Sequence, residues 1–171
     1  GMLDIETKTN LLQAVVEEED PDLVLGGVQS GDDALSATGV SLADELGFQW
    51  GAVVNEINYD PDENVAHIHR ELEGGVEELT DVDLPAVFTI QTGINEPRYA
   101  SLRGIRQAQT KEIASKSLDD IGLNAGAVES DLTLTSMYKP ESESDIETFE
   151  GEPNETAGEL AEVLREKGVA E

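Results

Sequence analysis

The sequence predicts an α/β fold in which a Rossmann-like sheet carries an antiparallel β-hairpin excursion. Three features of its 171 residues lead to this prediction. Apolar residues recur at helical spacing near the start, a short apolar run closed by Gly26 and Gly27 follows, and the middle of the chain is a series of strand-like segments separated by turns. A helical start followed by hairpins is typical of a sheet that is parallel in one part and antiparallel in another.

Two helices and one strand are expected in the first 47 residues. Apolar residues at helical spacing predict a helix over 8–19, and the residues that carry this pattern are Leu11, Leu12, Val15 and Val16. The apolar run 23–25 predicts a buried parallel strand, and the polar segment 28–37 predicts a loop. Thr38 is expected to cap a second helix that continues to Leu46 and stops at Gly47.

The middle of the chain is predicted to be mainly β-structure. The strand-like segments are 50–58, 65–71, 76–79 and 86–91, with turns at 60–64 and 73–75. A short helix is expected over 102–110, and one more strand over 132–137. Only one plausible parallel strand precedes the hairpins, whereas a parallel sheet needs several. We therefore expect a sheet that is truncated at its N-terminus, and Gly1-Met2 resembles a cloning remnant.

The end of the chain is predicted to be an acidic linker followed by a helix. Residues 139–155 are acidic and contain Pro140 and Pro153. Thr156 and Glu159 fit a capping box, which predicts that the last helix begins there and ends at Lys167. The predicted organisation is a partial Rossmann-like nucleotide-binding domain over 1–138, with a linker and helical arm over 139–171.

The strongly acidic composition excludes several classes of partner. The chain has 38 Asp and Glu against 10 Lys and Arg, a formal net charge of −28. Such a chain repels nucleic-acid phosphates and anionic membrane surfaces, because both are bound mainly through Lys and Arg. The acids occur throughout the chain, and their repulsion opposes folding unless salt screens it. We therefore expect a halophilic source.

Cysteine usage and hydropathy exclude further kinds of site and bear on the location of the protein. The chain has no cysteine, which excludes disulfides, thiolate metal sites and a cysteine nucleophile. No apolar run approaches the roughly 20 residues that a membrane span needs, and no signal peptide is visible at the start. A cytoplasmic location is therefore expected.

The segment 23–39 is the first candidate for binding chemistry. Its glycines let a backbone approach a ligand closely, and its loop amides and the following helix N-terminus suit a phosphate. The hydroxyls of Ser30, Ser36 and Thr38 are candidate hydrogen-bond donors. The segment is not a Walker loop, because it has no Gly-Lys-Ser/Thr. A plain connection between a strand and a helix is the alternative.

The bases are unevenly distributed. Five of the ten bases lie within 97–118 beside a single acid, Glu112, and these bases are Arg98, Arg103, Arg106, Lys111 and Lys116. Tyr99 and Leu102 lie among them. This pattern favours a docking segment for an acidic partner with Leu102 as the apolar anchor. The alternative is a helix that offsets the acidity of its own neighbours.

His67 and His69 share one face of a predicted strand and form a candidate metal pair. Two histidines without a third ligand are a weak signal, and solvated histidines on a strand are the more ordinary interpretation, so no metal site is predicted. Glu71, before a Gly-Gly turn, is a candidate for a cofactor or subunit interface.

Two stretches together resemble the beta subunits of electron transfer flavoproteins. The first is Asp22-Leu-Val-Leu-Gly-Gly-Val-Gln-Ser-Gly-Asp-Asp33, followed by Thr38-Gly39. The second contains Arg70-Glu-Leu-Glu-Gly-Gly-Val-Glu77, Asp83-Leu-Pro-Ala-Val87 and Asn95-Glu-Pro-Arg-Tyr-Ala-Ser-Leu102. The resemblance covers nearly the whole chain and weakens after about Ile113.

The resemblance implies an adenine nucleotide alpha hydrolase-like fold in a heterodimer with a flavin-bearing alpha subunit, on which the C-terminal helix packs. It implies AMP, or a second FAD, at a loop site formed by Gly27, Val28, Gln29, Ser30, Asp33, Ser36, Ala37 and Thr38. Glu71 would lie at the subunit interface near the FAD of the alpha subunit. Many members have a polar pair where Ser36-Ala37 stand, so fewer side-chain contacts to the nucleotide are expected.

The resemblance also implies a recognition loop that docks partner proteins. The residues that match it are Arg98, Tyr99, Leu102, Arg103 and Arg106. The implied function is a redox carrier without a substrate of its own, which passes electrons from acyl-CoA or other flavin dehydrogenases through FAD to a membrane quinone reductase. The alternatives are an adenine-nucleotide-binding module of the universal-stress or ATP-pyrophosphatase type, and a fragment that binds nothing alone.

Overall fold

The computed structural model describes residues 3–139 and 147–169 of the chain. The elements are α1 (Ile5–Glu19), β1 (Leu23–Gly27), α2 (Thr38–Leu46), β2 (Gln49–Asp60), β3 (Val65–Leu72), β4 (Val76–Asp83), β5 (Ala86–Ile90), α3 (Leu102–Gln109) and α4 (Pro153–Glu166), with short 3-10 turns at Glu73–Gly75, Asp119–Ile121 and Ala125–Val128. They divide into two compact units, Gly1–Thr135 and Ser136–Glu171. No helix among the described residues is both long and apolar enough to cross a membrane.

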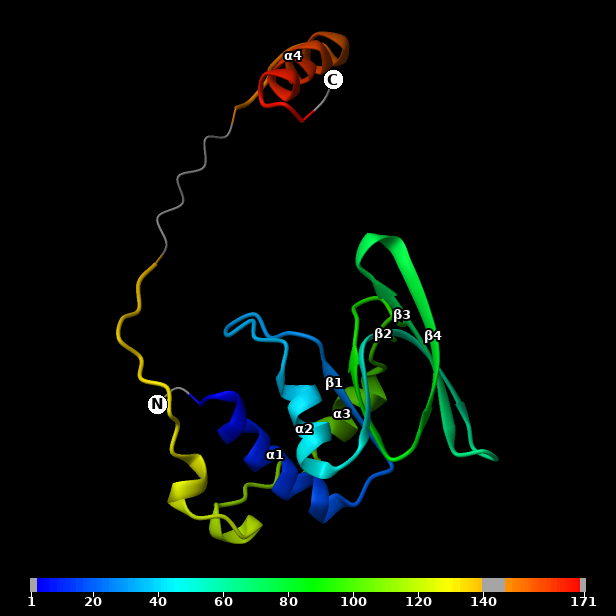
Figure 1. The fold of residues 1–171 in the computed structure, drawn as a ribbon, viewed down its shortest axis with the longest axis vertical. Coiled ribbons are helices and arrows are strands. Elements are labelled where there is room, and N and C mark those ends of the chain that lie inside the picture. Colours follow the sequence, from blue (N-terminus) through cyan, green and yellow to red (C-terminus); the bar gives the residue numbers. More distant parts are fainter. Residues whose placement is uncertain (1–2, 140–146, 170–171) are drawn as a thin grey trace. The chain divides into compact units, whose positions relative to one another are not determined.

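The first unit contains one five-stranded mixed sheet (Figure 1) with the strand order β1-β5-β2-β3-β4. β5 lies between β1 and β2 and pairs with both in parallel. β3 pairs antiparallel with β2 on one side and with β4 on the other. The expected Rossmann-like α/β fold with an antiparallel excursion is therefore confirmed.

β2 belongs to both parts of the sheet because it is long and irregular. Its first residues pair with β5, and its second half, from Val54 to Asp60, pairs with β3. Between Gly51 and Val54 the register shifts, and Val53 takes a left-handed φ of 59°. The Val53 amide donates a hydrogen bond to the Thr89 hydroxyl at 3.0 Å. A bulge of this kind bends a strand, which lets β2 leave the parallel sheet and enter the hairpins.

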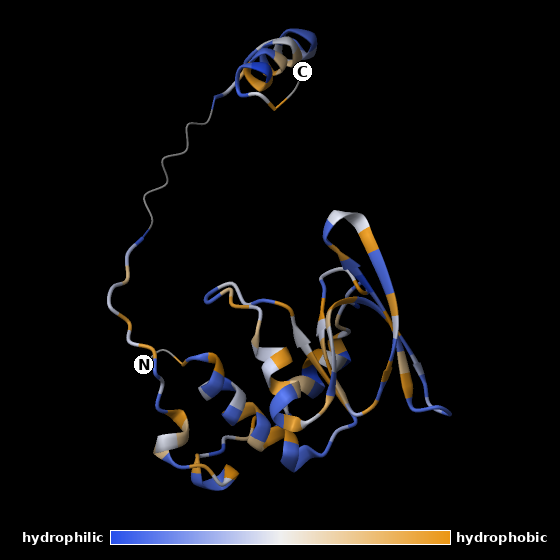
Figure 2. Ribbon diagram, viewed as in Figure 1, coloured by the Kyte–Doolittle hydropathy of each residue, from blue (hydrophilic) through white to orange (hydrophobic). Residues whose placement is uncertain are grey.

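The core lies where the hairpins meet the parallel strands, and its buried residues are Val54, Ala66, Ile68, Val82, Ala86 and Phe88. A Cβ at Gly51 would lie 2.7 Å from Ile68 Cδ1 and 3.0 Å from Phe88 Cδ1, so only glycine lets β2 pass this closely. Hydrophobic and hydrophilic residues alternate along the outer hairpin (Figure 2), as expected for strands with one covered face.

On the other face of the parallel strands, α2 packs against β5 and β2, and α1 packs against α2 (Figure 1). Leu42 and Ala43 of α2 are buried there. A Cβ at Gly39 would collide with the Thr89 methyl group. The absence of a side chain at Gly39 thus sets how closely the start of α2 approaches β5, and this placement shapes the site described below.

Two sequence expectations for the C-terminal part of the chain are wrong. Residues 132–137 are not a strand, because no neighbouring strand in the described part of the chain pairs with them. The last helix begins at Pro153 and not at Thr156, with Glu152 as its N-cap. Proline suits the first position of a helix because its missing N–H would have had no partner there. Residues 140–146 of the predicted linker lie outside the described residues, as does Gly1-Met2.

Candidate functional site

A cavity of about 350 Å³ opens at the carboxyl end of β1. Its lining comes from the end of β1, the loop that follows, the start of α2 and one side chain of α1: Lys8, Gly27, Val28, Gln29, Ser30, Asp32, Asp33, Ser36, Ala37, Thr38 and Gly39. The carboxyl end of a parallel strand is the usual place for a ligand in an open α/β sheet.

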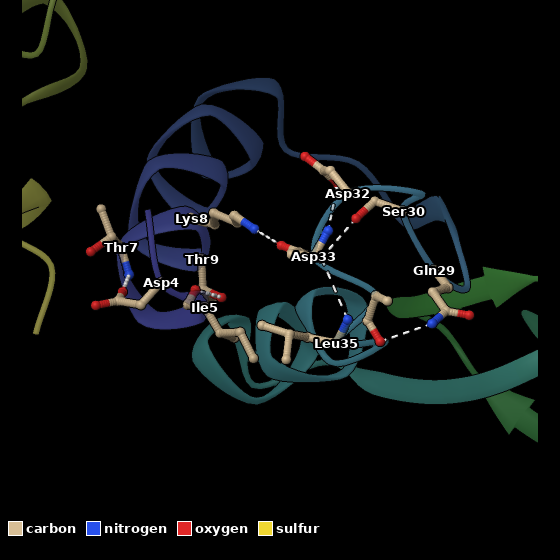
Figure 3. A network of polar contacts seen from close by, with 11 residues as sticks. Asp4, Ile5, Thr7, Lys8, Thr9, Gln29, Ser30, Asp32, Asp33 and Leu35 are labelled. Atoms are coloured by element: carbon tan, nitrogen blue, oxygen red, sulfur yellow. Dashed lines mark hydrogen bonds and ion pairs between the residues drawn. The ribbon is translucent and has the colours of Figure 1, made fainter. Parts of the chain in front are cut away.

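Internal hydrogen bonds fold the loop over 28–37 into this shape (Figure 3). Gln29 Nε2 donates to the backbone oxygen of Ala34 at 2.8 Å. Ala34 and Ser36 both take left-handed backbone conformations, each with φ 54°. Residues other than glycine rarely adopt this conformation, so the contacts that flank it must hold it in place.

Asp33 is the polar centre of the loop. Its Oδ1 accepts from Ser30 Oγ at 2.7 Å and from the Leu35 amide at 3.4 Å, while its Oδ2 forms an ion pair with Lys8 Nζ of α1 (Figure 3). These donors, Lys8 first and Ser30 second, lower the pKa of Asp33 to about 2. Asp33 is therefore a carboxylate at any pH at which the protein is handled.

A second carboxylate lies next to it. Asp32 Oδ1 accepts from the Asp33 amide at 2.9 Å, and the Ser30 hydroxyl and this amide hold the pKa of Asp32 below its ordinary value. The ionisable side chains of the lining are therefore Lys8, Asp32 and Asp33, one cation and two anions. The cation is already paired with Asp33, so no unpaired positive side chain of the lining faces a ligand.

The start of α2 differs from the expectation in one respect. The N-cap is Ala37 and not Thr38, and no side chain caps the helix. Thr38 is the first helical residue, and both Thr38 and Gly39 line the cavity. The first amides of an uncapped helix lack hydrogen-bond partners within the helix, and they favour the binding of an anion at this helix end.

The structure brings all eight predicted loop residues to one cavity: Gly27, Val28, Gln29, Ser30, Asp33, Ser36, Ala37 and Thr38. Their role in binding a nucleotide stays a prediction. The cavity also includes Lys8, Asp32 and Gly39. The sequence contained one signal for Lys8 that the sequence analysis did not use. Lys8 is the only Lys or Arg among the first 69 residues, which contain fifteen acids.

Glu71 does not line this cavity. It lies near the end of β3, exposed, and directly opposite Glu77 of β4 in the ladder. Two like charges placed opposite each other destabilise a hairpin slightly. Neither the neighbouring Arg70, which faces Glu78 at 3.5 Å, nor any other described cation forms an ion pair with Glu71. Its carboxylate is therefore available to another molecule.

The two histidines are each matched with a carboxylate across the hairpin. His67 Nδ1 lies 2.6 Å from Asp81 Oδ1, and His69 Nε2 lies 3.6 Å from Glu77 Oε2. Asp81 raises the pKa of His67, chiefly through this hydrogen bond. In the ranges 3–139 and 147–169, no three or more His, Cys, Asp or Glu side chains are grouped to hold a metal ion.

The basic segment is a short exposed helix with its preceding loop. Ser101 caps α3, its hydroxyl accepting from the Gly104 amide at 3.1 Å. Leu102 is 80% exposed and Tyr99 is fully exposed. Leu102, Arg103 and Arg106 line one shallow groove of about 410 Å³ together with Gln107 and Thr110. This short helix therefore presents an apolar side chain and two cations side by side.

The bases of the segment differ in whether they form ion pairs. Arg98, Arg103 and Arg106 form no ion pair with any residue that the structure describes, whereas Lys116 pairs with Glu18 of α1. Lys116 therefore offsets local acidity, which was the alternative considered for the whole segment. The three arginines remain available to a partner.

Comparison with known proteins identifies the family. Residues 1–121 match the electron transfer flavoprotein domain. The chain is 46% identical over 159 residues to an electron transfer flavoprotein subunit beta of Methylophilus methylotrophus, covering 91% of this chain and 60% of the relative. The corresponding subunits of Bacillus subtilis and Sus scrofa are 31% and 33% identical, each over 92% of this chain and over 60% and 58% of their own lengths.

The chain thus spans about 60% of the length of these relatives. The matched region includes α1, β1, the loop after it and α2, which line the cavity, and also the hairpin that carries Glu71 and the exposed helix α3. The chain belongs to the electron transfer flavoprotein family, and the relatives that it resembles are beta subunits.

Proposed function

We propose that this chain is an electron-carrier subunit that pairs with a flavin-bearing alpha subunit and holds an adenine nucleotide in the cavity after β1. It acts as a redox carrier and has no substrate of its own. The observation that carries this proposal is the convergence of the loop, the uncapped start of α2 and Lys8 on one cavity. The family relationship supports the flavoprotein role.

The small set of phosphate donors in the cavity favours AMP over a second FAD. Lys8 is paired with Asp33, and Asp32 adds a further negative charge. The phosphate of AMP and the pyrophosphate of FAD each carry about two negative charges at neutral pH, but AMP presents a single phosphate group, which the amides at the start of α2 and a small hydroxyl such as that of Thr38 can hold without an unpaired cation. AMP fits this donor set better.

The FAD would be held mainly by the alpha subunit, and this chain would contribute a wall of that site. Glu71 is the residue proposed to face it. An exposed carboxylate without an ion-pair partner among the described residues suits contact with a cation of another subunit. FAD supplies the redox chemistry, and Glu71 would orient the subunit that carries it.

The docking surface proposed for dehydrogenases consists of Arg98, Tyr99, Leu102, Arg103 and Arg106. Its exposed leucine is an apolar anchor, and its unpaired arginines attract an acidic partner surface. The partners proposed are acyl-CoA or other flavin dehydrogenases, which deliver electrons, and a membrane quinone reductase, which accepts them. α4, whose Leu160 is half exposed, is proposed to pack on the alpha subunit.

The setting proposed is the cytoplasm of a halophilic organism. A net charge of −28 on 171 residues is compatible with a stable fold where salt screens the repulsion between carboxylates. An adenine-nucleotide-binding module without a redox role is the second candidate function. Such a module would bind its nucleotide without pairing with a flavin-bearing subunit, and this property distinguishes it from the electron-carrier subunit.

The proposal is tested by co-expressing this chain with the alpha subunit from the same genome in high salt. A complex that co-purifies and contains both FAD and AMP is the expected result. Nucleotide binding without any association with the alpha subunit would instead favour the module without a redox role. Absence of both association and nucleotide would overturn the proposal.

A further inference from the structure

We infer that Lys8 is a positioning residue for the nucleotide loop: from α1 it holds Asp33, and through Asp33 it keeps the left-handed segment 34–36 in the shape that forms the cavity. This role deepens the proposed function and rests on it, because the loop shape matters only if a ligand occupies the cavity. Lys8 would act through another residue and would not itself bind the ligand.

The contact joins two parts of the chain that are 25 residues apart. The side chain of Lys8 is 28% exposed and that of Asp33 13% exposed, so the pair is largely shielded from water. The Asp33 carboxylate accepts hydrogen bonds from three donors: Lys8 on α1, the Ser30 hydroxyl at the start of the loop and the Leu35 amide later in the loop (Figure 3). Removing Lys8 would leave a carboxylate with weaker, local partners only.

The loop needs an external restraint because its backbone is strained. Ala34 and Ser36 both have φ 54°, a conformation that costs energy for any residue with a side chain. Gln29 holds the Ala34 carbonyl from one side. Asp33, immediately before Ala34, is the restraint on the other side, and Lys8 is the donor that fixes Asp33 to an element outside the loop.

The helix that carries Lys8 is itself fixed. Asp4 caps α1 by accepting from the Thr7 amide at 2.8 Å, and its other oxygen accepts from Ser130 Oγ at 2.8 Å and the Asp131 amide at 2.9 Å. α1 also packs against α2, whose first residues line the same cavity. Lys8 therefore connects the loop to two helices that pack against each other and that both contribute to the lining of the cavity.

A double-mutant cycle separates positioning from direct ligand contact. The variants are Lys8→Met, Asp33→Asn and the two together, and the probe is AMP, measured by calorimetry on the full chain in complex with its alpha subunit. If Lys8 acts through Asp33, each single change weakens AMP binding about 10-fold and the double change costs no more than Asp33→Asn alone. If Lys8 binds phosphate itself, Lys8→Met costs the same factor again in the Asp33→Asn background, which would overturn the inference.

Hydrogen exchange of the amides of 28–37 gives a readout that needs no ligand. Lys8→Met is expected to accelerate exchange in this segment about 10-fold or more while leaving α2 unchanged, and Lys8→Arg is expected to restore protection. Lys116→Met is the matched control, since Lys116 also forms an ion pair with a carboxylate, that of Glu18 at the end of α1, but does not contact the loop. Unchanged exchange in Lys8→Met would contradict the inference even if the wild type binds AMP. A wild-type protein that does not bind AMP would count against the proposed function. The exchange rates of the loop amides would then still show whether Lys8 holds the loop in place.

Discussion

His67 and Asp81 face each other across the β3–β4 ladder, with Nδ1 and Oδ1 2.6 Å apart. They occupy directly paired positions of the hairpin. The other charged groups that influence the imidazole are Asp60 and Glu63, from the end of β2 and the turn before β3. All three neighbours are acidic, so the hairpin surrounds this histidine with negative charge.

This pair predicts a pH dependence of stability. The folded-state pKa of His67 is raised above its ordinary value of 6.5, so the charged contact stabilises the folded chain below pH 6.5 and is lost as the pH rises through the raised pKa. Thermal midpoints measured at constant salt should therefore fall as the pH is raised from 6 to 8. His67→Gln should flatten this part of the profile, and an equal slope in the variant would contradict the assignment.

Gly51 is predicted to be intolerant of a side chain. The Cβ of Gly51→Ala would press on Ile68 and Phe88 in the core, an overpacking that typically costs about 1–3 kcal/mol of unfolding free energy. Gly26→Ala, in β1, is the control, because a Cβ there would meet no atom within 4 Å. Denaturant unfolding of both variants checks the difference. Equal stabilities would show that β2 does not pass the core as closely as described.

Sequence patterns predicted those elements whose ends have local signals. α2 was expected to end at Leu46 and does so, because Gly47, with φ 65°, ends the helix through a left-handed cap that glycine favours. β4 was expected to end at Leu79 but continues to Asp83. Polar residues such as Asp81 gave no strand signal, yet they pair with β3, and such cross-strand partners are not visible in a local window.

Other features depend on contacts between distant residues and escaped prediction for that reason. The segment 132–137 was expected to be a strand, but no described strand lies beside it to complete a ladder. The local pattern of glycines and hydroxyls indicated the segment 23–39, and the family resemblance implied the individual loop residues of the candidate site. Lys8 was not, because its link to Asp33 exists only once α1 packs beside the loop.

The net charge of −28 predicts folding that depends on salt. At 0.1 M salt the Debye length is about 10 Å, so neighbouring carboxylates repel each other, whereas at 1 M it is about 3 Å. The thermal midpoint is expected to rise by several degrees between 0.1 and 2 M KCl. A midpoint that stays constant or falls would contradict the proposed adaptation to high salt.

Leu102 is predicted to anchor the dehydrogenase partner. Burying an apolar side chain of this size contributes about 1.5–3 kcal/mol, so Leu102→Ala should weaken coupling to a cognate acyl-CoA dehydrogenase about 10-fold or more while leaving the FAD content unchanged. Leu79→Ala is the matched control, because Leu79 is as exposed as Leu102 but lies on β4. Wild-type coupling in Leu102→Ala would refute the docking role.

The central claim is that the loop after β1 binds an adenine nucleotide, and the most direct test is the nucleotide content of the purified heterodimer. Asp33→Ala removes the carboxylate that accepts from Lys8, Ser30 and the Leu35 amide, so it should disturb the loop while leaving Glu71, which does not line the cavity, intact. Chromatography of the acid extract should find AMP in the wild type, much less AMP in the variant, and equal FAD in both. AMP retained at the wild-type level in Asp33→Ala, or absent from the wild type, would contradict the account.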